Sequence, residues 1–403
     1  MSLRLGGASW LSPCSVLDAR RRRRARTIRR LPGKLTFWRR RAVAGLAAVA
    51  VGIGLWVALA DGTTGEDETA ARAAAGDLTT RRLAGQRLVA GFEGRHPPHA
   101  VKRMIRRGRV AGVILFSDNL GSRAHARRLI RRLQAIRRPK GLRDSLLVMI
   151  DQEGGVVKRL SGAPEASAQA MGRRGAHYSR HQGARTARNL KQVGVNVDLA
   201  PVLDVGRPGS AIRAQHRSFA GKPRRVIRTA IPFANAIEQR GVATTGKHFP
   251  GLGAAAENTD LAVQRIRLKR RELRRIDERP YRAFVARDGD MVMISTAIYT
   301  HLSRKPAAFS KAIATGELRD RLGFDGVSIS DALETVSARH FGGPARVGVA
   351  AAKAGTDLLL FADRHAAARA GRALRRELRS GKLARAAFED SAQRVLDLRA
   401  SLP

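Results

Sequence analysis

The sequence contains little cysteine, little aromatic character and little proline, and each shortage excludes a class of protein. Its 403 residues include one cysteine, Cys14, which excludes an internal disulfide framework and a cysteine-based zinc site. Aromatic residues make up 4%, so stacking platforms for single-stranded nucleic acids are scarce. The 15 prolines and 40 glycines follow no G-x-y period, which excludes a collagen-like chain. The fold must therefore depend on apolar burial, and a chain of this length can bury a large core.

Acidic residues are also few, 33 against 77 basic ones, which gives a formal net charge of +44. Such a charge first suggests a polyanionic partner. The arginines, however, are spread along the chain, often as pairs such as Arg106 and Arg107 on stretches of helical composition. Three interpretations are open: a general arginine bias on solvated helix faces, attraction to anionic cell-envelope polymers or lipids, and nucleic-acid binding. We favour the first, keep the envelope polymers as candidate partners, and expect no nucleic acid.

The first sixty residues differ from the remainder of the chain. Residues 1–41 carry thirteen basic residues and one acid. Residues 42–60 contain no charge over nineteen positions, which at about 1.5 Å per residue is just enough to cross a hydrocarbon core. Acids follow from Asp61 onward. The positive-inside rule then predicts a basic cytoplasmic segment at 1–41, a membrane anchor at 42–60, and a domain outside the cytoplasm.

Two alternatives to an anchor are open for residues 42–60. Residues 58–60 (ALA) fit a small-x-small cleavage site, so a signal peptide cut after Ala60 would give a secreted protein. A buried core helix is disfavoured because the run has no polar face. We expect a single-pass anchor, since the basic segment is long for a signal peptide. Residues 61–84 are then predicted to be a linker, and residues 85–403 one domain.

From about residue 85 the chain repeats one pattern, a short apolar run followed by an arginine- and alanine-rich stretch. Near-continuous β-branched runs are typical of parallel strands covered on both faces. Eight such units predict an α/β protein with a (β/α)8 TIM-barrel fold. A doubly wound open sheet is the alternative, but the glycine-rich phosphate loop usual after its first strand is absent. The runs are residues 87–93, 110–116, 146–151, 195–205, 242–249, 291–296, 326–332 and 356–362.

Polar residues cluster where these runs end, and a barrel of this kind carries its active site at the carboxyl ends of its strands. The clustered residues are Asp151 in the third run, Asp198 and Asp204 in the fourth, Lys247 and His248 in the fifth, and Asp331 in the seventh. Alone, each could be a loop cap or part of a surface ion pair. Several charged groups at one barrel rim instead indicate a binding or catalytic site.

The common motifs for other chemistries are absent. The ten histidines show neither H-x-H nor H-E-x-x-H spacing, and there is no G-x-S-x-G elbow or P-loop. Carboxylate chemistry is left, and a carboxylate nucleophile with a proton donor is a standard way to hydrolyse a glycosidic bond. Nearby lysine, histidine and arginine would bind sugar hydroxyls and lower the pKa of the nucleophile. We therefore expect a carbohydrate substrate, with no metal and no cofactor.

Five motifs resemble those of a known family. They are residues 150–155 (IDQEGG) with Arg159, 200–205 (APVLDV), 217–219 (RSF), 246–251 (GKHFPG) and 323–331 (GFDGVSISD). With them the chain resembles glycoside hydrolase family 3, and within it the single-barrel β-N-acetylhexosaminidases that trim peptidoglycan fragments. The resemblance runs from about residue 85 to 400. It implies a TIM barrel that acts as a retaining glycosidase on β-linked N-acetylhexosaminides of the cell wall, with β-glucosides as the alternative substrates.

The resemblance also implies roles for single residues. Asp331 matches the family nucleophile, which forms a covalent glycosyl-enzyme intermediate. The residues that match the sugar-binding positions of the family are Asp151, Arg159, Arg217, Lys247 and His248. Gly154 and Gly155 would let the backbone pass close to the sugar ring.

One departure concerns the acid/base. In these hexosaminidases the loop after KHFPG carries Asp-Ser-His, whose histidine is the acid/base, whereas the aligned residues here are Asn258, Thr259 and Asp260. A carboxyl can take this role if apolar surroundings or a nearby Asp331 raise its pKa, which makes Asp260, or Glu257 beside it, the first hypothesis. The second is a glycan-binding protein without hydrolytic power. The third is a donor from elsewhere, or activity only on substrates with good leaving groups.

Overall fold

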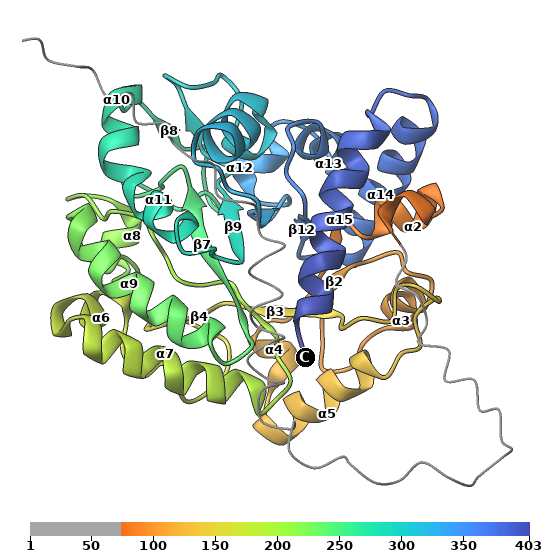
Figure 1. Cartoon of the computed structure of the whole chain (residues 1–403), viewed down its shortest axis with the longest axis horizontal. Helices are drawn as coiled ribbons and strands as arrows, with labels where there is room; N and C mark the ends of the chain where they lie inside the picture. Colours follow the sequence, from red (N-terminus) through yellow and green to blue (C-terminus); the bar gives the residue numbers. More distant parts are fainter. Residues whose placement is uncertain (1–73) are drawn as a thin grey trace, which may run out of the picture. The chain divides into compact units, whose positions relative to one another are not determined.

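The computed structural model describes residues 74–403, and Figure 1 shows its elements in chain order. Eight parallel strands form the central sheet. Their spatial order is β11 (Val327–Ser330), β9 (Met291–Ile294), β7 (Ala243–Phe249), β6 (Val197–Asp198), β3 (Leu147–Ile150), β2 (Gly112–Ile114), β1 (Leu88–Ala90) and β12 (Leu359–Phe361). Each strand lies within one of the eight predicted runs, so the predicted strand set is confirmed.

The sheet curves into a nearly closed barrel. Its two end strands, β11 and β12, meet at a parallel bridge between Ile329 and Leu358. There the amide of Ser330 donates to the carbonyl of Leu358 at 2.9 Å, and the amide of Leu358 donates to the carbonyl of Ser328 at 2.8 Å. Around the barrel, the strands follow chain order, as successive βα units require. The predicted α/β barrel is confirmed, and the open doubly wound sheet is excluded.

Helices surround the strands (Figure 1). The long ones are α5 (Arg123–Gln134), α7 (Ala176–Lys191), α9 (Pro223–Glu238), α14 (Arg364–Arg379) and α15 (Arg385–Ser401). The shorter ones are α2 (Thr80–Gly85), α3 (His99–Arg106), α4 (Ser117–Leu120), α6 (Ala168–Arg174), α8 (Ala211–Ala214), α10 (Arg270–Glu272), α11 (Arg279–Val285), α12 (Val336–Arg339) and α13 (Pro344–Lys353). Single turns and irregular helices are η1 (Ala75–Asp77), η2 (Leu273–Asp277), η3 (Ala307–Phe309) and η4 (Ala312–Arg321).

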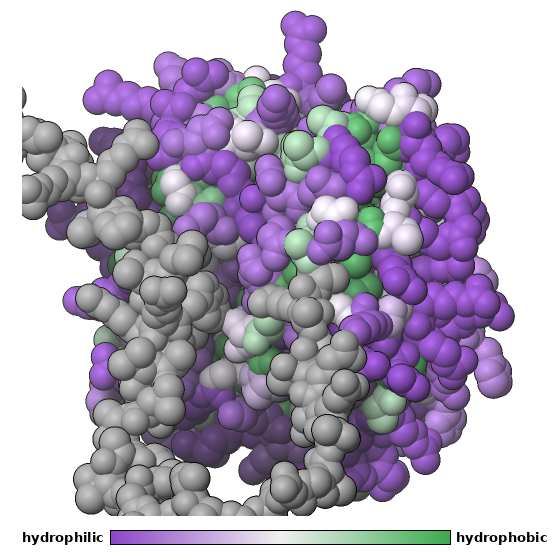
Figure 2. Space-filling model, turned by 45° about the vertical axis from the view of Figure 1, so that its right-hand side comes forward, coloured by the Kyte–Doolittle hydropathy of each residue, from purple (hydrophilic) through white to green (hydrophobic). Residues whose placement is uncertain are grey.

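The long helices are amphipathic, and their arginines lie on the solvent side. In α14, Ala366, Ala370 and Leu374 are buried, whereas Arg372 and Arg376 are exposed. This spacing of three and four residues places one face on the barrel and the other in water. Figure 2 shows hydrophilic side chains over most of the face in view, with small hydrophobic areas between them. The expectation that most arginines decorate solvated helix faces fits this arrangement.

The core consists of two apolar clusters that share the strands. Alternate residues of β3 belong to different clusters: Leu147 and Met149 to the smaller, and Val148 and Ile150 to the larger. The smaller cluster takes residues from all eight barrel strands, so it fills the barrel interior. It also includes Leu398 of α15. The guanidinium of Arg399 donates to carbonyls of the segment just before β3, so α15 covers the amino-terminal end of the barrel.

Packed structure begins earlier than the sequence analysis indicated. The described part of the predicted linker 61–84 contains η1 and most of α2, and both Leu78 and Leu83 are buried. The amide of Ala75 donates to Oε1 of Gln393 in α15 at 2.9 Å. The predicted basic segment 1–41 and apolar segment 42–60 lie outside the described residues. Within residues 74–403, no helix combines the length and the apolar character needed to cross a bilayer.

Candidate active site

The predicted site residues come from segments at the carboxyl-terminal end of the barrel. Asp151 directly follows β3, Lys247 and His248 lie near the end of β7, and Asp331 directly follows β11. A small antiparallel ribbon of β4 (Gln152–Gly154) and β5 (Val157–Lys158) leads from Asp151 to Arg159, while a parallel pair joins β8 (Arg265–Ile266) to β10 (Ile298–Tyr299). These segments are distant in sequence, but parallel strands bring their ends to one rim.

A network of three cations and two carboxylates lies at the centre of this rim. The ammonium of Lys247 contacts Asp151 Oδ1 at 2.6 Å and Glu153 Oε1 at 2.8 Å. The guanidinium of Arg217 donates two parallel hydrogen bonds to Glu153, both of 2.8 Å. Arg159 Nη2 lies 3.6 Å from Asp151 Oδ2. The structure thus brings together four of the five residues predicted to bind the sugar.

Glu153 links this network, and sequence reasoning gave it no role. Its side chain is 2% exposed. Although burial favours the neutral acid, Arg217 and Lys247 hold the pKa of Glu153 well below its usual range. Burial lowers the pKa of Lys247, but Asp151 and Glu153 more than offset this and raise it. The spacing of Glu153 from Asp151 could have identified it. Residues two apart in an extended segment lie on the same side, as Asp151 and Glu153 do here.

Gln152, between the two carboxylates, fixes the loop that carries Arg159. Its amide nitrogen donates to the carbonyls of Leu160 at 2.8 Å and Ala163 at 2.9 Å. Its amide oxygen accepts from the backbone of Arg159 at 3.1 Å and of Leu160 at 3.0 Å. A buried amide that satisfies four partners holds its loop rigidly, so Gln152 positions Arg159 without facing the substrate.

The two glycines that follow have a packing role. Gly154 and Gly155 have φ of 95° and 61°, which side chains with a Cβ rarely adopt. A Cβ on Gly154 would lie 2.3 Å from the carbonyl oxygen of Ala166. Close packing of the ribbon on the chain at 166–167 therefore explains the glycines.

Asp204 organises the other side of the rim. Its Oδ2 accepts from Nδ1 of His248 at 2.8 Å, and its Oδ1 accepts from the backbone amides of His248 at 3.1 Å and Leu252 at 2.7 Å. Since a carboxylate only accepts, Nδ1 carries the proton and Nε2 is left for another partner. Asp204 was predicted to lie within a strand, but β6 ends at Asp198 and Asp204 lies in the following segment. It therefore positions His248 and the start of the loop after β7.

Two buried tyrosines hold this side of the rim by hydrogen bonds, and the sequence analysis identified neither. Tyr281 of α11 donates to Asp204 Oδ1 at 3.3 Å, and Tyr299 of β10 donates to the carbonyl of Gly251 at 3.0 Å. Burial and the charge of Asp204 raise the pKa of both hydroxyls well above the usual value. They thus remain protonated donors. The only signal was their rarity, since the chain has three tyrosines.

Asp331 lies where the charges of both networks act on it. Its Oδ1 accepts from the amide of Ala332 at 2.8 Å. Burial raises its pKa, the charges of His248 and Lys247 lower it, and the negative charge of Asp260 raises it again. The net pKa of Asp331 is above the usual value. The expectation that surrounding cations lower the pKa of this carboxyl was wrong in its net direction, because burial outweighs them.

Asp260 lies on an exposed loop after β7 that packs against the segment after Asp331. Its carboxylate accepts from Asn258 Nδ2 at 3.1 Å, and its amide donates to Asn258 Oδ1 at 3.1 Å. Its carbonyl accepts from the amide of Val336 at 3.3 Å. The apolar enclosure expected around Asp260 is absent, since its side chain is exposed, as is that of Glu257. The structure nevertheless places Asp260 within electrostatic range of Asp331.

Asp198 supports the segment that follows β3 and carries the site residues. It is fully buried, and its Oδ1 accepts from the amide of Gln152 at 3.0 Å. Its Oδ2 has no hydrogen-bond partner among residues 74–403. Burial raises the pKa of Asp198 well above the usual value. A carboxyl whose charged form is disfavoured by burial is poorly suited to nucleophilic attack.

The carboxylates of the rim face cations and backbone amides and do not form a ligand set. Across residues 74–403, no group of three or more histidine, cysteine, aspartate or glutamate side chains is arranged to hold a metal ion. The polar groups at this rim include carboxyl groups, cations and one imidazole. Such groups can bind hydroxyls, attack a carbon centre and transfer protons.

Comparison with known sequences assigns the chain to a family. Residues 78–398 match the model for the glycosyl hydrolase family 3 N terminal domain. An uncharacterized secreted glycosyl hydrolase of Arthroderma benhamiae is 38% identical over 345 residues, which cover 83% of this chain and 96% of that protein. A beta-hexosaminidase of Pseudomonas aeruginosa is 35% identical over 271 residues, covering 66% of this chain and 79% of that protein.

Solved structures agree with the sequence comparison. A beta-N-acetylhexosaminidase from Beutenbergia cavernae superposes with a TM-score of 0.74 at 29% identity, covering 80% of this chain and 99% of that one. A family 3 beta-N-acetylglucosaminidase from Paenibacillus superposes with a TM-score of 0.76 at 32% identity; the match covers 80% of this chain but 63% of that longer one. The resemblance predicted from five motifs is confirmed: the chain belongs to glycosyl hydrolase family 3 and is a glycoside hydrolase.

Proposed function

We propose that the protein is a retaining β-N-acetylhexosaminidase that acts on glycans derived from the cell wall. The observation that carries the proposal is the convergence of Asp331 with Lys247 and His248 at one rim, beside the loop of Asp260. The relatives named beta-hexosaminidase and beta-N-acetylglucosaminidase support the choice of sugar. A β-glucoside is the alternative substrate.

In the first step Asp331 attacks the anomeric carbon. Its carboxylate forms the new C–O bond as the bond to the aglycone oxygen breaks, and Asp260 gives its proton to that oxygen. In the second step Asp260, now a carboxylate, takes a proton from water. The resulting hydroxide attacks the anomeric carbon and releases Asp331, so the two inversions give net retention.

The central network binds the sugar with the groups it has left. Lys247 has three protons, of which two contact Asp151 and Glu153, and the third can reach a sugar oxygen. Asp151 is 14% exposed and can accept from a hydroxyl. Arg159, which is 30% exposed, and Nε2 of His248 complete the set. Two N–H groups of Arg217 already donate to Glu153, so the main effect of Arg217 is to hold Glu153 against Lys247.

Asp260 lies where the family's hexosaminidases have the acid/base histidine, and Asn258 lies where they have the aspartate that orients it. The amide of Asn258 orients the carboxylate of Asp260, as an aspartate would orient a histidine. The negative charge of Asp260 raises the pKa of Asp331, so the two carboxyls interact in the free enzyme. Formation of the glycosyl ester removes the charge of Asp331. Asp260 can then carry a negative charge and act as the base at lower cost.

The place of action follows from the sequence outside the described residues. The segments 1–41 and 42–60 favour a domain outside the cytoplasm, held by an anchor or released by cleavage after Ala60. The secreted relative of Arthroderma benhamiae supports the extracytoplasmic location. The mass of the native mature protein distinguishes the two forms, because cleavage would remove residues 1–60.

The function is tested by hydrolysis of a panel of nitrophenyl β-glycosides by the full chain and by Asp331→Ala. We expect turnover of the N-acetyl-β-glucosaminide, loss of turnover in the variant, and a mass adduct on the peptide of Asp331 with a fluorosugar inactivator. Equal rates for both proteins would exclude Asp331 as the nucleophile. Turnover of the glucoside alone would replace the proposed sugar. Glycan binding without turnover would instead identify a binding protein.

A further inference from the structure

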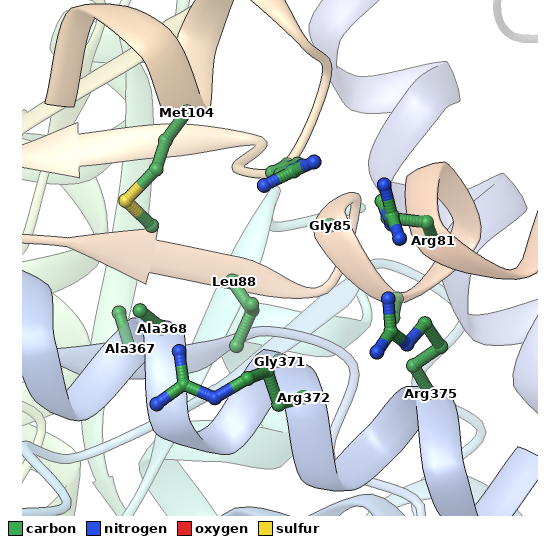
Figure 3. Close-up of a pocket in the computed structure, with 11 residues that line it drawn as sticks. Arg81, Gly85, Leu88, Met104, Ala367, Ala368, Gly371, Arg372 and Arg375 are labelled. Carbon is green, nitrogen blue, oxygen red and sulfur yellow. The ribbon is translucent and has the colours of Figure 1, made fainter. Parts of the chain in front are cut away.

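A pocket lies away from the carboxylate rim, near the amino-terminal end of β1. It has a volume of about 190 Å³ and is enclosed by α2, the start of β1, α3 and α14. Figure 3 shows Met104 of α3 on one side, with Leu88, Ala367 and Ala368 around the floor. Leu88 is the first residue of its strand, whereas the catalytic residues follow strand ends. The pocket is therefore separate from the active site.

Four arginines line this apolar floor, and they have no counter-ion among residues 74–403. Arg81 comes from α2, Arg109 from the loop before β2, and Arg372 and Arg375 from α14. None is within ion-pair distance of a carboxylate in that part of the chain. Burial and the neighbouring positive charges, first that of Arg81, lower the pKa of Arg109. Like charges held together without a partner among residues 74–403 favour an added anion.

The apolar floor distinguishes this pocket from other arginine clusters of the protein. An open cleft of about 710 Å³ on α10, η2 and α11 is lined by six arginines and nothing else. A surface of that kind attracts any polyanion. The pocket below α14 adds an apolar cavity, and a cavity of roughly 150 Å³ is enough to bind benzene. Its ligand should therefore carry both an apolar part and a negative charge.

We propose that this pocket binds an anionic phospholipid and seats the barrel on a membrane. The glycerol and upper acyl chain would pack on Leu88, Met104 and Ala368, and the phosphate would bind the guanidinium groups at the rim. Guanidinium groups bind phosphate oxygens in a bidentate manner. A neighbouring cleft of about 590 Å³ shares Arg372 and Arg375 and extends the cationic surface along α14.

The position of the pocket in the chain fits this occupant. α2, which carries Arg81, begins at Thr80, and the predicted anchor ends at residue 60. The intervening residues 61–79 extend at most roughly 65 Å. A bilayer that held residues 42–60 would thus be within reach of the pocket, and the tether would raise its effective concentration there. The catalytic rim, at the other end of the barrel strands, would remain open to glycan.

Vesicle flotation with the full chain tests the proposal. The vesicles contain phosphatidylcholine alone or phosphatidylcholine mixed with phosphatidylglycerol. The pocket variant is Arg81→Glu with Arg375→Glu, and the matched control is Arg271→Glu with Arg275→Glu, which makes the same charge change on the purely cationic cleft. Both retain residues 1–73, so any difference between them isolates the pocket. We expect affinity for the phosphatidylglycerol vesicles to fall at least roughly tenfold in the pocket variant and far less in the control.

A third variant, Ala368→Phe, fills the floor without changing the charge. We expect it to weaken binding of short-chain phosphatidylglycerol, measured by the rise in melting temperature, while glycoside hydrolysis stays at the wild-type rate. Equal losses in the two double variants would overturn the proposal. So would polyphosphate that binds as strongly as the lipid and is unaffected by Ala368→Phe, because the pocket would then be a surface for polyanions. Hydrolysis serves as the folding control and reports separately on the proposed function.

Discussion

The two sides of the active site are held by different forces. Glu153, Lys247 and Arg217 are buried among matched charges, whereas Asp260 lies on an exposed loop held by its contacts with Asn258 and Val336. Buried charges must be paired as the chain folds, so their positions are fixed by stability. A proton donor must instead reach both a leaving group and water. Substitutions on the buried side should therefore affect folding and activity together, and substitutions in the loop should affect activity alone.

The largest expected effect is at Asp331, where the two sides meet. Asp331→Asn should lower kcat/KM on the order of 10⁴-fold or more for every substrate, whatever its leaving group. Stability should not fall, because the amide oxygen can still accept from Ala332 and a desolvated carboxyl is removed. Hydrolysis of nitrophenyl and alkyl glycosides, with a thermal melt of each protein, measures both. A loss confined to alkyl glycosides would make Asp331 a proton donor and not the nucleophile.

Asp260→Ala should give the next largest effect, and one that depends on the leaving group. Loss of a general acid costs about 10²–10⁴-fold, so alkyl glycosides should lose this much and nitrophenyl glycosides much less. Azide should restore turnover by replacing the base-activated water. Glu257→Ala is the matched control on the same exposed loop. If Glu257→Ala shows this pattern and Asp260→Ala does not, the acid/base is Glu257.

The same variant changes the pH dependence through Asp331. The rate requires an ionised Asp331, so the wild-type rate falls as the pH drops through its raised pKa. Asp260 contributes to that rise by its negative charge. Asp260→Ala should therefore move the acidic limb of kcat/KM to lower pH. An unmoved acidic limb would show that the two carboxyls do not interact.

Glu153→Gln examines the buried side. The substitution removes the negative charge that pairs with Lys247 and Arg217 and leaves both cations buried. Breaking a buried ion pair in this way costs about 3–5 kcal/mol. We expect this loss in the free energy of unfolding from urea denaturation, together with weaker sugar binding. Glu165→Gln is the control, because Glu165 contacts Arg185 at 2.7 Å with both side chains more than 40% exposed. That exposed pair should cost at most about 1 kcal/mol.

The sequence predicted the strands better than the contacts between them. The eight runs were found because strands covered on both faces are continuously apolar, and this signal is local. The rim residues followed because parallel strands end on one side. The contact of Tyr281 with Asp204, 77 residues apart, depends on how α11 packs and leaves no local pattern. The pairing of Glu153 with Arg217 likewise depends on where β4 meets the segment after α8.

The start of the domain was also set by long-range contact. Residues 61–80 contain many glycine, threonine, aspartate and glutamate residues, which is why a linker was predicted at 61–84. Residues 75–84 nevertheless pack against the barrel. Leu78 and Leu83 are buried, and the amide of Ala75 donates a hydrogen bond to Gln393 in α15. Composition describes a segment alone, whereas packing against α15 decides its structure.

Glu334, which lies near Asp331 in the chain, should give the smallest effect. It follows Asp331 by three residues, and its carboxylate accepts from the amides of Ala362 at 3.1 Å and Asp363 at 2.9 Å. Burial, partly opposed by these bonds, raises its pKa from 4.5 to about 7. The folded protein thus keeps a proton that the unfolded chain has released. This contribution to stability is complete below about pH 4.5 and is lost as the pH rises through about 7. Relative to Glu334→Gln, the wild type should lose roughly 2 kcal/mol between about pH 5 and pH 8, measured by urea denaturation. Parallel curves for the two proteins would mean that this carboxyl does not titrate there, and Glu165→Gln should leave the slope unchanged.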